Sequence, residues 1–104
     1  MTQPNLDMLP FEVDGTKYFP TRTAVRHAEE LSVPTSDFSG VVVAGSWEAA
    51  RNPGMFRVHA WDLTLILAPR AQGWAICGLQ RSDQKRAAIT LSDEDTALLA
   101  WLES

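Results

Sequence analysis

The 104-residue chain contains one cysteine and two histidines, and this scarcity excludes several kinds of site. A lone cysteine, Cys77, cannot form a disulfide within the chain, so nothing in the sequence calls for an oxidising compartment. His27 and His59 lie far apart in the sequence, and no HxH, HExxH or CxxC spacing is present. Zinc and other transition metals need several such ligands at defined spacings. We therefore expect neither a bound metal nor a cofactor.

The motifs of common catalytic sites are also missing. The chain has no GxSxG nucleophile elbow, no P-loop and no GxGxxG pattern. Cys77 lies in the apolar segment WAICGL, where burial keeps a thiol protonated and unreactive. No residue is therefore expected to be catalytic, and the sequence favours a non-enzymatic protein.

Long hydrophobic runs are absent as well. The most apolar run, residues 63–69, is far shorter than the ~20 residues that cross a bilayer. The N-terminal residues MTQPNLDMLP include neither the basic segment nor the apolar segment of a secretory signal. We therefore expect a soluble, cytoplasmic protein that does not associate with a membrane.

The charge balance is mildly acidic, with 13 acidic and 9 basic residues and a net charge of −4. Affinity for DNA or RNA comes largely from basic groups on phosphates, so nucleic acid is not an expected partner. The segment QRSDQKR does gather Arg81, Lys85 and Arg86, but Asp83 interrupts this cluster and no aromatic residue stands within it. The cluster therefore fits a polar loop or the rim of a protein-binding surface.

The segment FEVDGTKYF, residues 11–19, predicts a β-hairpin. Asp14-Gly15 is typical of a two-residue type I′ turn, in which both central residues take positive φ. One face of the hairpin then carries an aromatic pair and the other carries an ion pair. The predicted partners are Val13 with Thr16, Glu12 with Lys17, and Phe11 with Tyr18.

Patterns of apolar residues predict the other elements. A first helix should begin near Thr21 or Thr23 and stop before Pro34. Three successive valines in GVVVAG predict a strand buried on both faces over 40–45, and Ser46 should then cap a short helix, WEAARN, over 47–52. Later strands are expected within 56–61, 63–69, 74–79 and 87–91, and a last helix is expected after the N-cap Ser92.

Together these elements predict an α+β domain spanning residues 1–104. An antiparallel-rich sheet of about five to seven short strands would pack against two or three helices on one side. The predicted order is β-β-α-β-(short α)-β-β-β-β-α.

The segment MFRVHAWDLTLIL, residues 55–67, carries the best candidate for a contact surface. Alternation places Arg57, His59 and Trp61 on one face of a strand. Continued alternation would place the following leucines on that face, so either a bulge or tight bend near Trp61-Asp62 switches the faces or the second half of the segment is buried on both sides. Because tryptophan and arginine are enriched in protein interfaces, we expect this row to bind another protein, with the 81–86 basic cluster as a rim. If a helix covers this face instead, Trp61 belongs to the core.

The expected function is therefore that of a small protein-binding module, such as an inhibitor, an immunity protein, a phage-encoded antagonist or an accessory subunit. Association of two copies through an edge strand is an alternative mode of contact. The alternative class is a ligand-binding or catalytic domain. It would use an anion at Gly45, Ser46 and Trp47, at the start of the predicted short helix, or a proton-transfer pair of His59 and Asp62.

Overall fold

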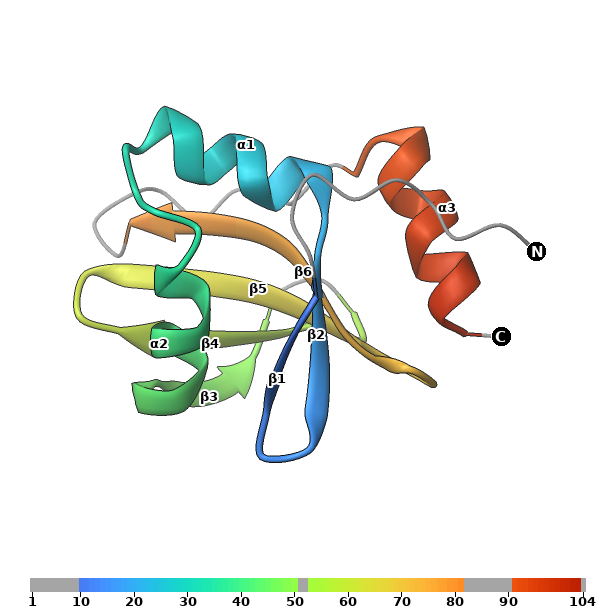
Figure 1. The fold of residues 1–104 in the computed structure, drawn as a ribbon, viewed down its shortest axis with the longest axis horizontal. Helices are drawn as coiled ribbons and strands as arrows, with labels where there is room; N and C mark the ends of the chain where they lie inside the picture. The colour runs from blue at the N-terminus through green and yellow to red at the C-terminus, as the bar shows by residue number, and fades with distance from the viewer. Residues whose placement is uncertain (1–9, 51–52, 82–90, 104) are drawn as a thin grey trace.

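A computed structural model describes residues 10–50, 53–81 and 91–103 of the chain (Figure 1). Within them a six-stranded mixed sheet has the strand order β1-β2-β6-β5-β4-β3. The β2–β6 pair is parallel and the other pairs are antiparallel, so the predicted α+β class with an antiparallel-rich sheet is confirmed. The elements are β1 (Phe11–Val13), β2 (Thr16–Pro20), α1 (Arg22–Glu30), α2 (Asp37–Ala44), β3 (Ser46–Ala49), β4 (Phe56–Ala60), β5 (Leu63–Arg70), β6 (Gly73–Arg81) and α3 (Asp93–Leu102).

The N-terminal hairpin forms as predicted, in the predicted register. Asp14 and Gly15 have φ values of 51° and 82°, as a type I′ turn requires. The rings of Phe11 and Tyr18 stack with centroids 5.3 Å apart. The cross-strand partners are Phe11 with Tyr18, Glu12 with Lys17, and Val13 with Thr16.

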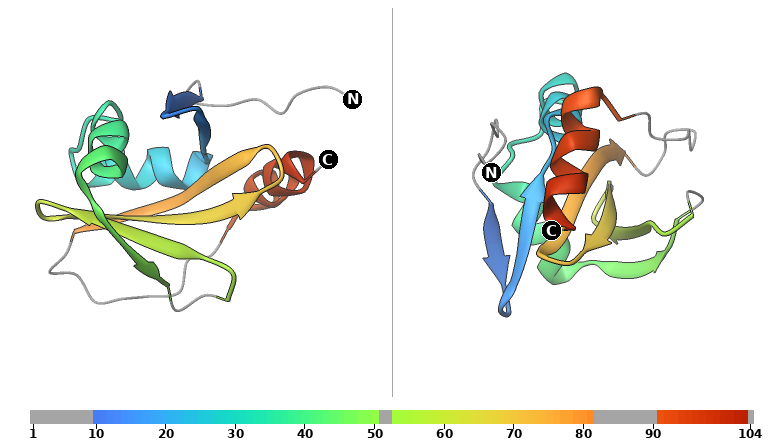
Figure 2. Two further views of the ribbon diagram at one scale, coloured as in Figure 1. Left: turned by 90° about the horizontal axis from the view of Figure 1, so that it is seen from below. Right: turned by 90° about the vertical axis from the view of Figure 1, so that its right-hand side faces the viewer.

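Helices cover both faces of the sheet, so the expectation of helices on one side is wrong. Side chains alternate between two cores: Tyr18 packs with α1 and α2, whereas its neighbour Phe19 packs with α3. In β6, Ile76 likewise belongs to the first core and Cys77 to the second. Figure 2 shows α1 and α2 close together, with α3 at the other end of the sheet. Strands buried on both faces explain why WAICGL is apolar throughout.

Residues 40–50 reverse the prediction, because the expected strand is a helix and the expected helix begins as a strand, β3. In α2 the buried side chains are Phe38, Val41 and Val42, at the i, i+3, i+4 spacing of one helix face. Val43 is 68% exposed, which a strand buried on both faces would not allow. Ser46 is therefore no N-cap, since it opens β3, which pairs with β4.

The bend expected near Trp61-Asp62 is confirmed as the turn of a hairpin between β4 and β5. Ala60 pairs with Leu63 across it. Val58 of β4 pairs with Leu65 of β5, and both side chains lie in the core that α1 and α2 cover. The turn thus resolves the mismatch in alternation and places Arg57 and His59 on the opposite face. Residues 63–68 of β5 are all buried, so this strand is also buried on both sides. The strand predicted over 87–91 lies outside the described residues.

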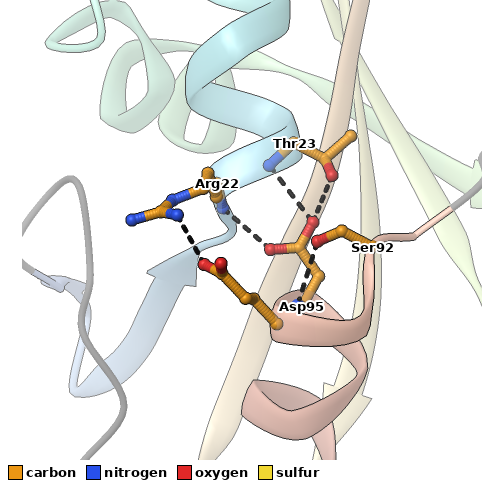
Figure 3. A network of polar contacts seen from close by, with 5 residues as sticks. Arg22, Thr23, Ser92 and Asp95 are labelled. Atoms are coloured by element: carbon orange, nitrogen blue, oxygen red, sulfur yellow. Dashed lines mark hydrogen bonds and ion pairs between the residues drawn. The ribbon is translucent and has the colours of Figure 1, made fainter.

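The first and last helices begin at their predicted caps and are joined by one carboxylate. Thr21 and Ser92 accept hydrogen bonds from Ala24 N and Asp95 N, respectively. Asp95 is 2% exposed, and its carboxylate accepts from the backbone N–H groups of Arg22 (3.0 Å) and Thr23 (3.2 Å) and from the Thr23 hydroxyl (Figure 3). A side chain of α3 therefore caps the N-terminus of α1.

Candidate functional site

Trp61 is an exposed aromatic side chain at a constrained backbone position. It opens the β4–β5 turn with φ of 56°, and its side chain is 71% exposed, the most exposed large hydrophobic residue in the described ranges. A two-residue hairpin turn with positive φ only at its first central residue is of the type II′ class, where glycine is preferred. A bulky residue with positive φ is uncommon and costs backbone energy. The fold therefore holds this indole in solvent at some cost to its own stability.

The Trp61 ring lies against α2. A Cβ added to Gly40 would come within 3.2 Å of Trp61 Cη2, so the absent side chain of Gly40 makes room for the indole. Val43 lies one turn further along the same side of α2 and is 68% exposed. We call Gly40, Val43 and Trp61 the Trp61 surface.

An ion pair borders the Trp61 surface. Asp62, the next residue in the turn, accepts from Arg81 Nη1 at 2.8 Å, and Arg81 Nη2 donates to the carbonyl of Leu31 at 3.0 Å. Arg81 is one of the predicted rim residues, and in the structure it pairs with Asp62, the residue that follows Trp61 in the chain. Lys85 and Arg86, the other residues of that basic cluster, lie outside the described residues.

The predicted row of Arg57, His59 and Trp61 is not a single surface. Strand β4 ends at Ala60, so Trp61 leaves the alternation that would have aligned it with the other two. Arg57 is only 7% exposed and therefore contributes little accessible surface. The predicted partnership of His59 with Asp62 is wrong too, because Asp62 pairs with Arg81 while His59 bonds to Glu48 and Thr64.

Arg57 and His59 belong instead to a polar cluster with Glu48 and Thr64, which we call the Glu48 cluster. Glu48 Oε1 accepts from Arg57 Nη2 and lies 2.6 Å from His59 Nε2. The Thr64 hydroxyl lies 2.8 Å from His59 Nδ1. The hydrogen bond from His59 lowers the pKa of Glu48 most, and the hydrogen bond from Arg57 lowers it further, so this carboxylate stays ionised. Sequence reasoning missed Glu48 because it assigned residues 47–52 to a helix.

The ionised carboxylate fixes the tautomer of His59. Glu48 can only accept, so His59 Nε2 must carry the proton that it shares with Glu48. The Nδ1 of a neutral ring then accepts from the Thr64 hydroxyl. Donors from Arg57 and His59 thus converge on one point beside β3.

Three further aromatic rings meet on the face that α1 and α2 cover. Trp74 makes edge contacts with Trp47 and Phe56, with ring centroids 5.2 and 5.6 Å apart. Trp47 is 40% exposed and Phe56 is 36% exposed, so the group remains partly open to solvent. No local pattern predicts this contact, because it joins β3, β4 and β6.

The helix N-terminus that the alternative anion site at Gly45, Ser46 and Trp47 requires is not formed. Gly45 ends α2, and the C-terminal end of a helix carries the negative end of its dipole. Gly45 serves close packing instead: a Cβ there would lie 2.3 Å from Val58 Cγ2 and 2.5 Å from the Val41 carbonyl oxygen.

Cys77, the lone cysteine, is buried in the structure. Burial raises the pKa of the Cys77 thiol to about 12, with a smaller lowering effect of Arg70. No group of three or more potential metal ligands occurs within 10–50, 53–81 and 91–103. No helix in those ranges is long and apolar enough to span a membrane.

Comparison with known proteins gives no family assignment. No protein-family model matches the chain, and neither the curated proteins nor the solved structures include a match. The function is therefore inferred from the geometry of the chain itself.

Proposed function

We propose that the protein is a non-enzymatic protein-binding module whose contact surface is the Trp61 surface. The observation that carries this proposal is the indole of Trp61, which is 71% exposed at a backbone position with φ of 56°. Strained backbone conformations cluster at functional sites, where their cost serves something other than folding. Here the strain presents the side-chain type most enriched at interface hot spots.

The surroundings of Trp61 support the same proposal. Interface hot spots combine a central aromatic anchor with neighbouring apolar area and a polar rim. Val43 supplies exposed apolar area on α2, and the Asp62–Arg81 pair supplies charges of both signs beside the anchor. The single cysteine is buried, which fits a reducing compartment, and we propose a cytoplasmic location on that basis.

The ligand-binding and catalytic alternative has weaker support. Both of its predicted sites depended on local geometry that differs in the fold, since Gly45 ends a helix, and His59 bonds to Glu48 while Asp62 pairs with Arg81. Identification of the partner distinguishes an inhibitor, which would bind its target, from an accessory subunit, which would join a larger assembly.

Affinity capture with three baits tests the proposal. Wild-type protein, Trp61→Gly and Trp47→Ala are immobilised in equal amounts, and proteins retained from a lysate of the native source are quantified by mass spectrometry. Trp61→Gly removes the indole and suits the positive φ, so its free energy of unfolding should stay within about 1 kcal/mol of wild type. Trp47→Ala removes an equally large indole from a different surface.

We expect one protein that wild type and Trp47→Ala retain and that Trp61→Gly loses. Binding of that protein, once purified, should show the same difference. Equal retention by all three baits would overturn the choice of surface, and the absence of any retained protein would weigh against a binding module.

A further inference from the structure

Arg57 is a buried cation with an unused donor. Its side chain is 8% exposed, and Nε is a buried nitrogen without a hydrogen-bond partner. Buried polar groups are almost always paired, because leaving a donor unpaired costs its full desolvation energy. An unpaired nitrogen on a buried arginine therefore calls for an explanation.

The unused donor lies beside one that is used. Nε–H and one N–H of Nη2 share an edge of the planar guanidinium, and this edge accepts both oxygens of a carboxylate. In the Glu48 cluster only Nη2 is engaged, by Glu48 Oε1. The same oxygen is bonded to His59 Nε2, so one carboxylate oxygen serves two side chains while Nε has no acceptor.

Glu48 can leave this position without disturbing either core. It lies on β3, the last strand of the sheet order, and all four residues of that strand are exposed. The Glu48 side chain is 48% exposed and that of His59 is 32% exposed. Rotation of Glu48 into solvent would uncover the Arg57 edge and the His59 Nε2 donor together.

We propose that Arg57 and His59 form a binding site for a carboxylate ligand and that Glu48 is an internal occupant which the ligand displaces. Arg57 would hold both oxygens through Nε and Nη2, and His59 would donate a third hydrogen bond through Nε2. Thr64 is a positioning residue, because its hydroxyl bonds to Nδ1 and directs Nε2 outward. The side chain that already occupies the site, Glu48, is a carboxylate. Arg57 carries one permanent positive charge, which matches the single negative charge of a carboxylate ligand. This proposal is independent of the Trp61 surface.

The Glu48→Gln variant tests the site, because it removes the competing charge and keeps the shape of the side chain. Glu103→Gln is the matched control, since Glu103 pairs with an arginine, Arg70, at 3.2 Å elsewhere on the surface. Acetate is titrated into each protein, and the ¹H–¹⁵N resonance of Arg57 Nε is followed by NMR. The same titration with inorganic phosphate tests the choice of anion.

In Glu48→Gln the Nε–H resonance should move downfield and saturate, with acetate binding about tenfold tighter than in wild type or Glu103→Gln. An unmoved resonance in Glu48→Gln, or the same response in all three proteins, would overturn the site. Tighter binding of phosphate than of acetate would overturn the assignment to carboxylates.

A second titration separates the two sources of a carboxylate. A short amidated, acetylated peptide with a single glutamate replaces acetate. Saturation by both probes supports a site that an acidic side chain of a protein partner can fill. Saturation by acetate alone supports a site for a free small carboxylate.

Discussion

Replacement of Asp95 by alanine should destabilise the fold more than replacement of the other acidic residues in the first turn of α3. The Asp95 carboxylate accepts from two backbone N–H groups at the start of α1 and from the Thr23 hydroxyl. Hydrogen bonds to a charged acceptor contribute roughly 1.5–3 kcal/mol each, but bonds that share one acceptor are not additive. Water can also reach Arg22 N, which is only partly buried. We therefore expect a loss of about 3 kcal/mol, or about 12 °C in Tm for a domain of this size.

Urea unfolding followed by far-UV circular dichroism at 25 °C measures this loss. Asp95→Asn keeps one acceptor oxygen and should lose about half as much. Asp93→Ala is the matched control, because Asp93 is exposed in the first turn of the same helix and should contribute only about 0.5 kcal/mol through the helix dipole. A loss below about 1 kcal/mol for Asp95→Ala would refute the reasoning, since it would mean that the capped N–H groups are satisfied without the carboxylate.

Three further predictions follow from packing and titration. Gly45→Ala should cost about 1–3 kcal/mol in urea unfolding, because its Cβ would clash with Val58 and the Val41 backbone, and an unchanged midpoint would contradict that close approach. Cys77 should not react with Ellman's reagent at pH 8 in the native protein and should react at once in urea, since burial raises its pKa to about 12; rapid native labelling would disprove its burial. Glu48 has a lowered pKa, so between its folded and its unfolded pKa the folded protein binds fewer protons than the unfolded chain; the resulting stability is fully present above the unfolded pKa and is lost as pH falls through the folded pKa. The Tm difference between wild type and Glu48→Gln should therefore shrink as the pH falls below about 4.5, the ordinary pKa of a glutamate, and a constant difference would exclude this titration.

Elements with strong local signals could be predicted from the sequence. The Asp14-Gly15 turn determines the register of the first hairpin, and the caps Thr21 and Ser92 mark the starts of α1 and α3. In each case the determining contact joins residues close together in the chain. The same holds for the turn at Trp61-Asp62, where a break in alternation indicated a bend.

Elements decided by distant contacts could not be predicted. Three valines favour a strand by intrinsic preference, but burial of Phe38, Val41 and Val42 against β4 and β5 stabilises a helix. The parallel pairing of β2 with β6 and the capping of α1 by Asp95 join residues far apart in sequence.

The candidate site likewise combines a feature that depends on local sequence with a cluster that depends on distant contacts. Exposure of Trp61 depends on the local turn, and the sequence already favoured an outer face for that residue. The partners of Arg57 and His59 come from β3, which the sequence assigned to a helix, so the Glu48 cluster could not be assembled. One sequence signal for this strand was present, because apolar Trp47 is followed by charged Glu48, as in a strand with one apolar and one polar face.

Site-specific photo-crosslinking measures most directly whether Trp61 contacts a partner. Benzoylphenylalanine is placed at position 61 in one protein and at position 94 in another, since Glu94 is an exposed residue of α3 far from the Trp61 surface in the sequence. After irradiation in native cells, we expect one discrete crosslinked product from position 61 and none of that mass from position 94. The same product from both positions, or none from position 61 while Trp61→Gly still captures the partner, would contradict the proposed contact surface.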